Sequence, residues 1–587
     1  MVDLRLYRMA FLPFALAIVY VAFSLGTWPA GLGTTLPPTA FDGTAASATV
    51  RALGAAYPDR RPGSAGDQRL AAHMAGVFRS DGFATTTSTF TGDTVSGRRR
   101  LETVVASRQG AKSPSIVIVA HRDSARAGSP AELSGTAALV ELAHVFSETT
   151  THRGLTFVST SGGSGGAAGA ADLAARLPLP VDAVIVLGDL GGSRSSRPYV
   201  VPWSDGSQVA PIGLRRTLEA ALHGQLGRSP GGTAVSDQLA RLVFPLTVGE
   251  QGPFGARGIP AVLIQQSGEV GPRAGDPLAA SPARFQEFGR GVLAAIDALD
   301  NGPTIPAPTR DLLFGHLVLQ ASSVRLLVFL AILPALVAAV DALARARRRR
   351  ASVGGSLAWL IAAAVPFWLA AIFAVLLGRT GLLAAAPTGP VTSRQLPSGV
   401  AGTIALISVG LVFALAWLLR APLARRLAPA GSPSDAGAPV ALILVACAIA
   451  LVVWLFNPYA ALLTLGPLHL WLFATMLERP PPKALSVALV GVSLLPVAFL
   501  IVLDCARLDL GPHAFAWTGL LMVAGAHIGL GSLVLWSLSG GCVVAAFAIA
   551  VTRAREHWEE PAPITVRGPV SYAGPGSLGG TDSALRR

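Results

Sequence analysis

The segment Ser115-Ile-Val-Ile-Val-Ala-His-Arg-Asp-Ser124 decides the fold of the soluble part of this chain. Its apolar run from Ile116 to Ala120 is rich in β-branched side chains, which is typical of a strand buried on both faces of a sheet. The run ends at His121 and Asp123, whose side chains can bind metal ions or exchange protons. A buried strand that ends in such residues predicts a functional site at the edge of a sheet.

Similar strands and helices surround this segment. Further short apolar runs lie at 155–159, 183–187 and 261–264, and amphipathic helical patterns lie at 136–146 and 282–299. Alternation of buried strands with helices predicts an α/β fold, with three αβα layers around a mostly parallel sheet. We assign residues 31–308 to this one domain, which is long enough for a single core.

The rest of the chain has the composition of a membrane protein. Only 13% of the 587 residues are charged, about half of the usual share in soluble proteins. The apolar run from Met9 to Trp28 is about 20 residues, longer than the apolar part of a cleaved signal peptide, so we expect residues 1–30 to be a retained signal anchor. Residues 326–552 predict an all-α bundle of about seven or eight helices. Its apolar stretches are 326–343, 355–378, 400–419, 437–456, 459–477, 484–504 and 513–552.

Arginine-rich loops follow alternate apolar spans and predict the topology. By the positive-inside rule they are cytoplasmic, which places the N-terminus inside and residues 31–320 outside the cytoplasm, in a multi-pass cell-membrane protein. Nine spans would put Arg553 outside, whereas eight spans and a re-entrant half-helix near Gly540 would put it inside; both remain open. We expect 309–325 to be a linker or interfacial helix and 553–587 to be a disordered tail.

Composition argues against several classes of protein. No basic stripe interleaved with aromatic side chains is present, so we expect the lipid bilayer and no nucleic acid as a partner. All three cysteines lie in the apolar half, so the α/β domain has no disulfide framework. Few ionisable residues and no inverted repeat disfavour a transporter. Abundant Arg and Ala with little Lys is typical of a high-GC bacterium.

An ordered set of motifs gives the domain a family resemblance. The motifs are Arg61-Pro-Gly-Ser64, Asp81-Gly-Phe83, Leu101–Val105, Ile116–Ser124, Ser134-Gly135, Phe157, Asp189-Leu-Gly191 and Phe254-x-x-x-Gly258-Ile-Pro260. In this order and spacing the domain resembles the M28 family of zinc aminopeptidases. The resemblance implies an M28-like fold, two zinc ions and a carboxylate base.

In the same comparison, most of the residues expected in the family's site are replaced in this chain. Two family ligands remain, at His121 and Asp189. The other family positions are Ala131, where a bridging Asp is expected, Gly163 for the general base, Ser164 for a ligand Glu, and Gln251 for a His. A dizinc site needs these ligands together with a base. We therefore expect no intact catalytic group and no bound cofactor.

Local rearrangement offers one alternative. Asp123, Glu132 and Glu250 stand near the lost positions and are candidate substitutes, so a divergent membrane-bound metallo-aminopeptidase with zinc stays open. A second alternative is a serine hydrolase, because Gly162–Gly166 fits the pattern G-x-S-x-G and is followed by Asp189 and His223. The position of His223 inside an amphipathic segment argues against it.

The favoured interpretation is a catalytically degenerate M28-like domain that acts as an extracytoplasmic binding or scaffolding module. Its former cleft would take an unknown protein or peptide partner. The architecture is similar to that of the M28-like attachment subunit of glycosylphosphatidylinositol transamidase, a likeness of layout alone.

Overall fold

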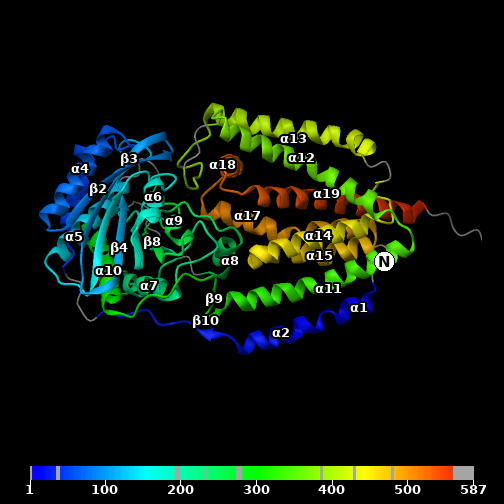
Figure 1. The fold of residues 1–587 in the computed structure, drawn as a ribbon, viewed down its shortest axis with the longest axis horizontal. Coiled ribbons are helices and arrows are strands. Elements are labelled where there is room, and N and C mark those ends of the chain that lie inside the picture. Colours follow the sequence, from blue (N-terminus) through cyan, green and yellow to red (C-terminus); the bar gives the residue numbers. More distant parts are fainter. Residues whose placement is uncertain are drawn as a thin grey trace, which may run out of the picture.

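An α/β domain and a bundle of long helices lie end to end along the long axis of the molecule (Figure 1). The structure is a computed structural model. It describes residues 3–34, 40–191, 198–231, 234–266, 268–272, 281–383, 388–427, 431–477 and 481–559.

The α/β domain is built on a seven-stranded sheet in the order β2-β3-β5-β4-β6-β8-β7. The strands are β2 (Ala84–Thr94), β3 (Gly97–Arg108), β4 (Lys112–His121), β5 (Arg153–Thr160), β6 (Val181–Leu187), β7 (Tyr199–Val201) and β8 (Ala261–Gln265). The central β5, β4, β6 and β8 are mutually parallel, and the outer strands pair antiparallel. This confirms the predicted α/β class and the predicted parallel centre of the sheet.

Strand β4 explains the three layers. Ile116, Ile118 and Ala120 join a core on one face of the sheet, whereas Val117 and Val119 join a core on the other. A strand buried on both faces needs apolar side chains at successive positions, because they alternate between the faces. The first core is covered by α3 (Gly43–Ala56), α4 (Ala65–Ser80), α5 (Ser134–Ser147), α7 (Ile212–Leu226) and α10 (Pro282–Asn301). The second is covered by α6 (Ala168–Arg176) and α9 (Gln251–Ala256).

A second, three-stranded sheet lies where the chain passes between domain and bundle. Strand β1 (Gly26–Thr27) pairs with β10 (Leu317–Leu319), which pairs with β9 (Leu312–Phe314). The segment expected to be a linker or interfacial helix is therefore a β-hairpin followed by the start of α11. A hairpin fits here because it gives the extended residues after the first span a partner for their backbone hydrogen bonds.

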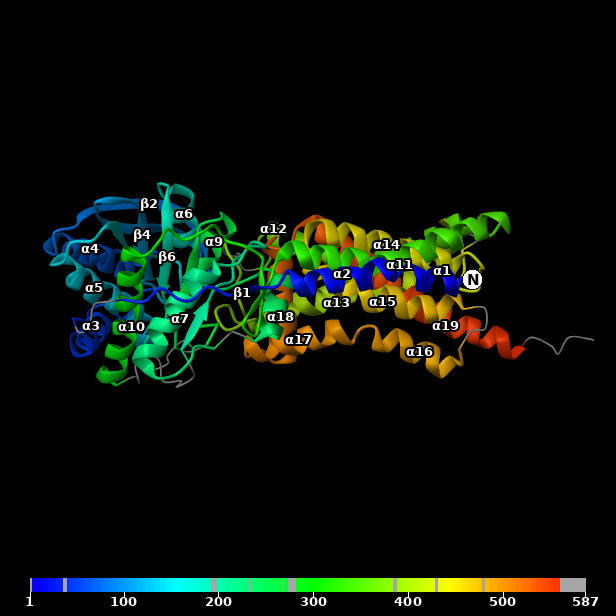
Figure 2. The same ribbon diagram turned by 90° about the horizontal axis from the view of Figure 1, so that it is seen from below.

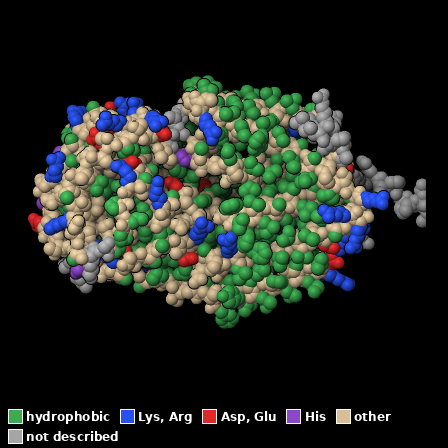
Figure 3. Space-filling view, viewed as in Figure 1, with side chains coloured by type: hydrophobic (Ala, Val, Ile, Leu, Met, Phe, Trp, Pro, Cys, Tyr) green, Lys and Arg blue, Asp and Glu red, His purple; other side chains and the backbone are tan. Residues whose placement is uncertain are grey.

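Within the described residues, seven helices are long and apolar enough to cross a membrane, by length and composition. They are the α1–α2 segment Leu4–Phe23, α11 (Ala321–Arg348), α12 (Val353–Arg379), α13 (Gly399–Leu427), α14 (Ala438–Phe456), α15 (Pro458–Met476) and α19 (Leu530–Glu559). An eighth crossing is possible if α16 (Lys483–Val492) and α17 (Leu495–Arg507), bent by 41°, act as one broken span. Apolar side chains cover the face of this region that is seen in Figure 3. The predicted polytopic all-α region is thus present.

The stretch 513–552 differs from both expectations. Its first part forms α18 (Pro512–Ala524), whose 13 residues reach about 20 Å and fall short of a bilayer. Gly540 is inside the long helix α19, and we correct its expected place in a half-helix. A Cβ at Gly540 or Gly541 would lie 3.0 Å from the Phe367 ring or 2.8 Å from the Ala364 Cβ, so these glycines permit close packing on α12. Helix α19 also continues into the segment expected to be disordered, and residues 560–587 lie outside the described residues.

A buried hydrogen bond holds the N-terminal helices against the bundle. Figure 2 shows α1 and α2 alongside α11. The Tyr7 hydroxyl lies 2.8 Å from Nδ1 of His469 on α15, and His469 Nε2 lies 3.0 Å from the Ala331 carbonyl oxygen. A carbonyl oxygen only accepts, so Nε2 donates to it and the hydroxyl of Tyr7 donates to Nδ1.

Substitution of Tyr7 by Phe should lower the apparent melting temperature of the purified full chain. The change leaves a buried imidazole nitrogen without its donor, which costs about 1–3 kcal/mol. Tyr20→Phe is the matched control, because Tyr20 is 65% exposed on the same segment. Equal melting temperatures for both variants would contradict this role of the bond.

Candidate functional site

A cavity of about 340 Å³ opens at the carboxyl ends of the four parallel strands. We call this cavity the cleft. In an open α/β sheet this edge is where ligands bind, because loops of several strands converge there. The domain supplies His121, Ala125, Arg126, Glu132, Gly163, Ser164, Val186, Gly188, Asp189, Val248, Gly249, Glu250, Leu263, Gln265 and Glu269–Pro272 to its lining. The bundle supplies Ser393, Arg394, Gln395 and Pro397.

His121 and Glu250 form an ion pair at the floor of the cleft. Nδ1 of His121 lies 3.2 Å from Oε2 of Glu250, and Thr160 donates to Oε1 at 2.7 Å. Burial by itself lowers the pKa of His121, but the hydrogen bond and the charge of Glu250 outweigh burial and raise this pKa to about 9. The imidazole is therefore protonated at neutral pH while it is paired with Glu250.

Glu250 lies against Gly163, the residue at which the family resemblance leads us to expect a general base. A Cβ at Gly163 would lie 2.4 Å from the Cβ of His121 and 2.6 Å from Cδ of Glu250. A glutamate at residue 163 would therefore overlap the present Glu250 carboxyl group. The absence of a side chain at residue 163 and the inward position of Glu250 therefore belong to one packing arrangement.

Asp123 is committed to the turn after β5. Its carboxylate accepts from the backbone N–H of Gly163 at 3.0 Å, from that of Ser164 at 3.1 Å, and from the Ser164 hydroxyl. Asp123 thus orders the glycine-rich turn. Ser164 donates to a carboxylate, and His223 is exposed on α7 away from the cleft lining, so the geometry does not support the serine-hydrolase alternative.

Gln251 points away from the cleft. It is fully buried in α9, and its side-chain amide donates to the carbonyl of Trp203 at 3.1 Å and to the Thr247 hydroxyl at 3.0 Å. The residue at which the family resemblance leads us to expect a His ligand is therefore part of the core contact of α9 with Trp203 and Thr247.

Glu132 and Asp189 are two further acidic residues that line the cleft. Burial raises the pKa of Glu132 to about 8, with His121 and Arg60 opposing the rise and Asp123 and Asp189 adding to it. Among the described residues no donor reaches Oε2 of Glu132. Asp189 accepts from the Ser134 hydroxyl at 3.2 Å and from the backbone N–H of Gly191 at 2.9 Å. Ala131 has its backbone in the turn Pro130–Leu133, and its side chain lies outside what is described.

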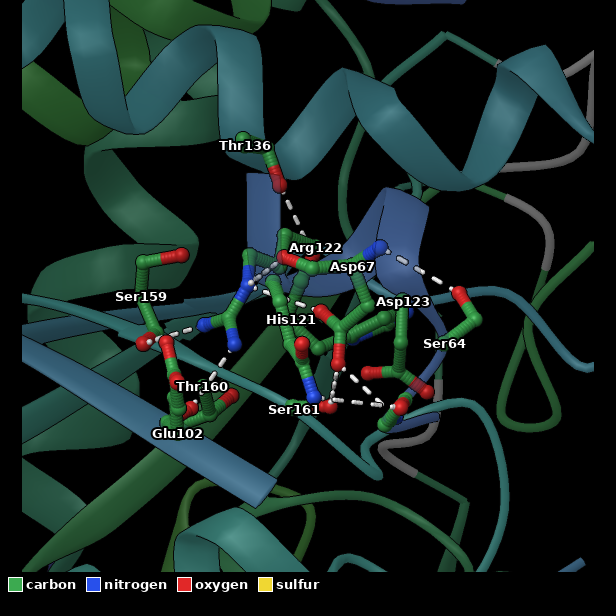
Figure 4. Close-up of polar contacts among 12 residues, drawn as sticks. Ser64, Asp67, Glu102, His121, Arg122, Asp123, Thr136, Ser159, Thr160 and Ser161 are labelled. Atoms are coloured by element: carbon green, nitrogen blue, oxygen red, sulfur yellow. Dashed lines mark hydrogen bonds and ion pairs between the residues drawn. The ribbon is translucent and has the colours of Figure 1, made fainter. Parts of the chain in front are cut away.

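A buried arginine beside His121 was missed by sequence reasoning. Figure 4 shows Arg122 between the carboxylate of Asp67 and neighbouring backbone carbonyls. Nε lies 2.8 Å from Oδ1 of Asp67, and the guanidinium donates to the carbonyls of Ser159 at 3.0 Å and Glu102 at 2.8 Å. Both side chains are almost fully buried. The pair cross-links α4, β3, β4 and β5 under the cleft, and only its long-range partner reveals this role.

The loop between α12 and α13 was also missed. Thr388 donates its backbone N–H to the carbonyl of Asp93 at 3.1 Å, and a Cβ at Gly389 would lie 2.6 Å from the carbonyl oxygen of Gly166. On the bundle side, Trp517 Nε1 donates to the Leu396 carbonyl at 2.7 Å. The loop therefore joins α18 to the glycine-rich turn and forms one wall of the cleft.

The residues present do not fit a zinc centre. Within the described residues no group of three or more His, Cys, Asp and Glu side chains is placed to hold a metal ion. The structure brings His121, Glu132, Asp189 and Glu250 to the cleft but holds Asp123 in the turn and Gln251 in the core.

Comparison with known proteins matches the α/β domain alone. No protein-family profile and no curated protein sequence matches the chain. Similar solved structures include a glutaminyl cyclase of Porphyromonas gingivalis (18% identity, 44% of this chain, 98% of that one, TM-score 0.34). A zinc aminopeptidase of Bacillus subtilis shares 13% identity over 44% of this chain and 95% of its own, with a TM-score of 0.35. A zinc-dependent exopeptidase of Parabacteroides distasonis shares 16% over 45% and 99%, with a TM-score of 0.36. The domain thus resembles the M28 peptidase fold, fused to a region of long apolar helices.

The ion pair at the floor of the cleft should make stability fall as the pH rises. The pKa of His121 lies above its ordinary value of 6.5, so the stabilisation is complete below pH 6.5 and is lost as the pH passes about 9. Glu132 acts in the same direction only up to about pH 8, so the interval from 8 to 9 reports His121. We expect the melting temperature of the wild type to fall across this interval and that of Glu250→Gln to stay flat.

The exposed pair of His144 and Asp81 provides the control for this titration. Its atoms are 3.4 Å apart and His144 is 61% exposed, so Asp81→Asn should follow the wild type. A Glu250→Gln variant with the wild-type slope would contradict the assignment.

Gly163→Ala should destabilise the protein by about 1–3 kcal/mol, because a methyl group cannot fit between His121 and Glu250. Gly76→Ala on α4 is the matched control, since its Cβ would meet open space and alanine favours a helix. The measurement is thermal unfolding of the two variants in the same detergent. A Gly163→Ala chain as stable as wild type would mean that the turn has room for a side chain.

Proposed function

We propose that this chain is a multi-pass membrane protein whose M28-like domain lies outside the cytoplasm and acts as a binding or scaffolding module without peptidase activity. The observation that carries the proposal is the contact of Glu250 with His121 in the space of the missing base. Dizinc hydrolysis needs a water held between two metals and a free carboxylate to deprotonate it. In this cleft the carboxylate is bound to an imidazolium instead.

The arrangement of the helices supports the proposed topology. Figure 1 shows the N-terminus and the end of α19 at the same end of the bundle, far from the α/β domain. An even number of crossings gives this result, which is met when α16 and α17 form one broken span. Exposed arginines 347–350 gather at that end (Figure 3). The positive-inside rule makes this end cytoplasmic and the α/β domain extracytoplasmic.

The cleft has the size and lining of a small binding site. Its volume is at the lower end of the range for ligand pockets, and apolar Val186, Val248 and Leu263 alternate with the polar floor. The wall from the bundle narrows its mouth, so an extended peptide end or a short loop of a partner protein is a fitting occupant. The partners of this chain are then the lipid bilayer and one peptide or protein, without nucleic acid.

A divergent membrane-bound metallo-aminopeptidase is the second candidate. In its favour, His121, Glu132, Asp189 and Glu250 line one cavity. It would require deprotonation of His121 and release of Glu250 from it, so that zinc could replace the proton. The layout of one N-terminal span, an M28-like domain and a helical bundle is similar to that of the transamidase attachment subunit. This likeness implies no substrate for the present chain.

Zinc content is the deciding measurement. We expect the full chain, purified in detergent, exposed to excess zinc and desalted, to carry no more zinc than its His121→Ala variant. Metal bound equally by both chains would lie outside the cleft. Stoichiometric zinc that depends on His121, with hydrolysis of amino-acid p-nitroanilides, would overturn the proposal and establish the aminopeptidase.

A further inference from the structure

The rim of the cleft is tied to the membrane bundle by one buried arginine. Glu269 lines the cleft, and its carboxylate binds Arg241 of α8 (Val235–Val243) through two contacts, Nε to Oε1 at 2.8 Å and Nη2 to Oε2 at 3.0 Å. The same guanidinium reaches Oδ1 of Asp504 on α17 at 3.1 Å. Arg241 and Glu269 are about 95% buried.

Burial makes this chain of charges stiff. A buried guanidinium that loses one carboxylate is left with an uncompensated charge, so each carboxylate is held firmly while the other stays in place. The paired bonds to Glu269 also fix direction as well as distance. A displacement of the rim therefore has to be followed by Arg241, by Asp504, or by both.

The last member of this series of ion pairs, Asp504, is on α17, and the junction of α17 with α16 can act as a hinge. Helices α16 and α17 meet at a 41° bend, and Pro496 in the first turn of α17 has no N–H to continue the hydrogen-bond ladder. Beside the bend, Trp471 Nε1 donates to the Ser493 hydroxyl at 2.9 Å. A broken helix can pivot at such a point with little loss of backbone bonding.

We propose that Arg241 couples the cleft to the bundle: an occupant that displaces the Glu269–Pro272 rim moves α17 through Glu269, Arg241 and Asp504. The proposal rests on the proposed function in that the cleft takes a ligand. Arg507 of α17 binds Asp237 of α8 at 3.0 and 2.7 Å but touches no part of the cleft. That second ion pair anchors α17 to α8, and Arg241 is the residue of α8 that joins the Glu269 rim to α17.

A native cysteine reports on this route. Cys505 follows Asp504 and is half-buried, whereas Cys447 and Cys542 are each 1% exposed. The rate at which a soluble maleimide labels the full chain in detergent therefore measures the surroundings of α17. Glu269→Gln should change this rate about fivefold or more, the lower range of measured couplings between sites. Glu132→Gln, the same change at a cleft residue outside the charge chain, should leave it unchanged.

A side chain built into the cleft replaces the unidentified ligand. Ala125 lines the cleft, so Ala125→Trp places a bulky group there, with Ala125→Phe as the smaller version. We expect either change to alter the labelling of Cys505, and the effect to vanish when Glu269→Gln or Asp504→Asn is combined with it. Ala171→Trp is the control, because Ala171 lines a separate cavity of about 380 Å³ that does not include Glu269.

Two results would overturn the coupling. One is an unchanged rate in both Glu269→Gln and the wedge variants, in chains that elute and melt as folded protein. The other is a wedge effect that persists without Glu269. Zinc bound at His121 would end the proposed function but would leave the labelling result standing, so the two failures are distinguishable.

Discussion

The glycine-rich turn after β5 is the constraint on which the site depends. Because Gly163 and Gly165 have no side chains, the turn leaves room for Glu250 to contact His121 and for Val95 to pack against the turn. A Cβ at Gly165 would lie only 2.3 Å from a side-chain carbon of Val95. A Cβ at Gly389 of the bundle would lie 2.6 Å from the carbonyl oxygen of Gly166. A single segment without side-chain volume thus makes room both for the contact of Glu250 with His121 and for the loop of the bundle.

Buried arginines hold the α/β domain together and join it to the bundle. Under the cleft, the Arg122–Asp67 pair holds the strands of the domain in place with buried hydrogen bonds. At the boundary, Arg241 is shared by a residue of the cleft and one of a membrane helix. Buried ion pairs add little net stability but are costly to break on one side, so they specify one arrangement of the parts they join. The α/β domain and the bundle are therefore better described as one unit than as an enzyme-like domain on a passive anchor.

Local sequence pattern was sufficient to predict the structure wherever residues nearby in the sequence determine whether a residue is buried. The alternation of Ile116–Ala120 predicted a doubly buried strand, and the lengths of the apolar runs predicted most of the long helices. Pattern did not reveal the strand pairing within 309–325 or the packing at Gly540, where distant segments decide: β1 pairs with the hairpin, and α12 fits against the glycines of α19. In the site, the positions of His121 and Asp189 at strand ends could be predicted, but the partners of Arg122 and Glu250 could not.

The sequence by itself determined which segments of this protein are apolar and which are polar, and where strands alternate with helices. It also determined which candidate zinc-ligand side chains the domain contains. Those properties follow from residue type and spacing, which act over a few residues. Only the tertiary structure decided that Glu250 packs against His121 and Gly163, that Gln251 is buried in the core, and that a loop of the bundle forms a wall of the cleft. The contact of Glu250 with His121 joins residues 129 positions apart, and its formation depends on packed volume and burial that no local pattern encodes.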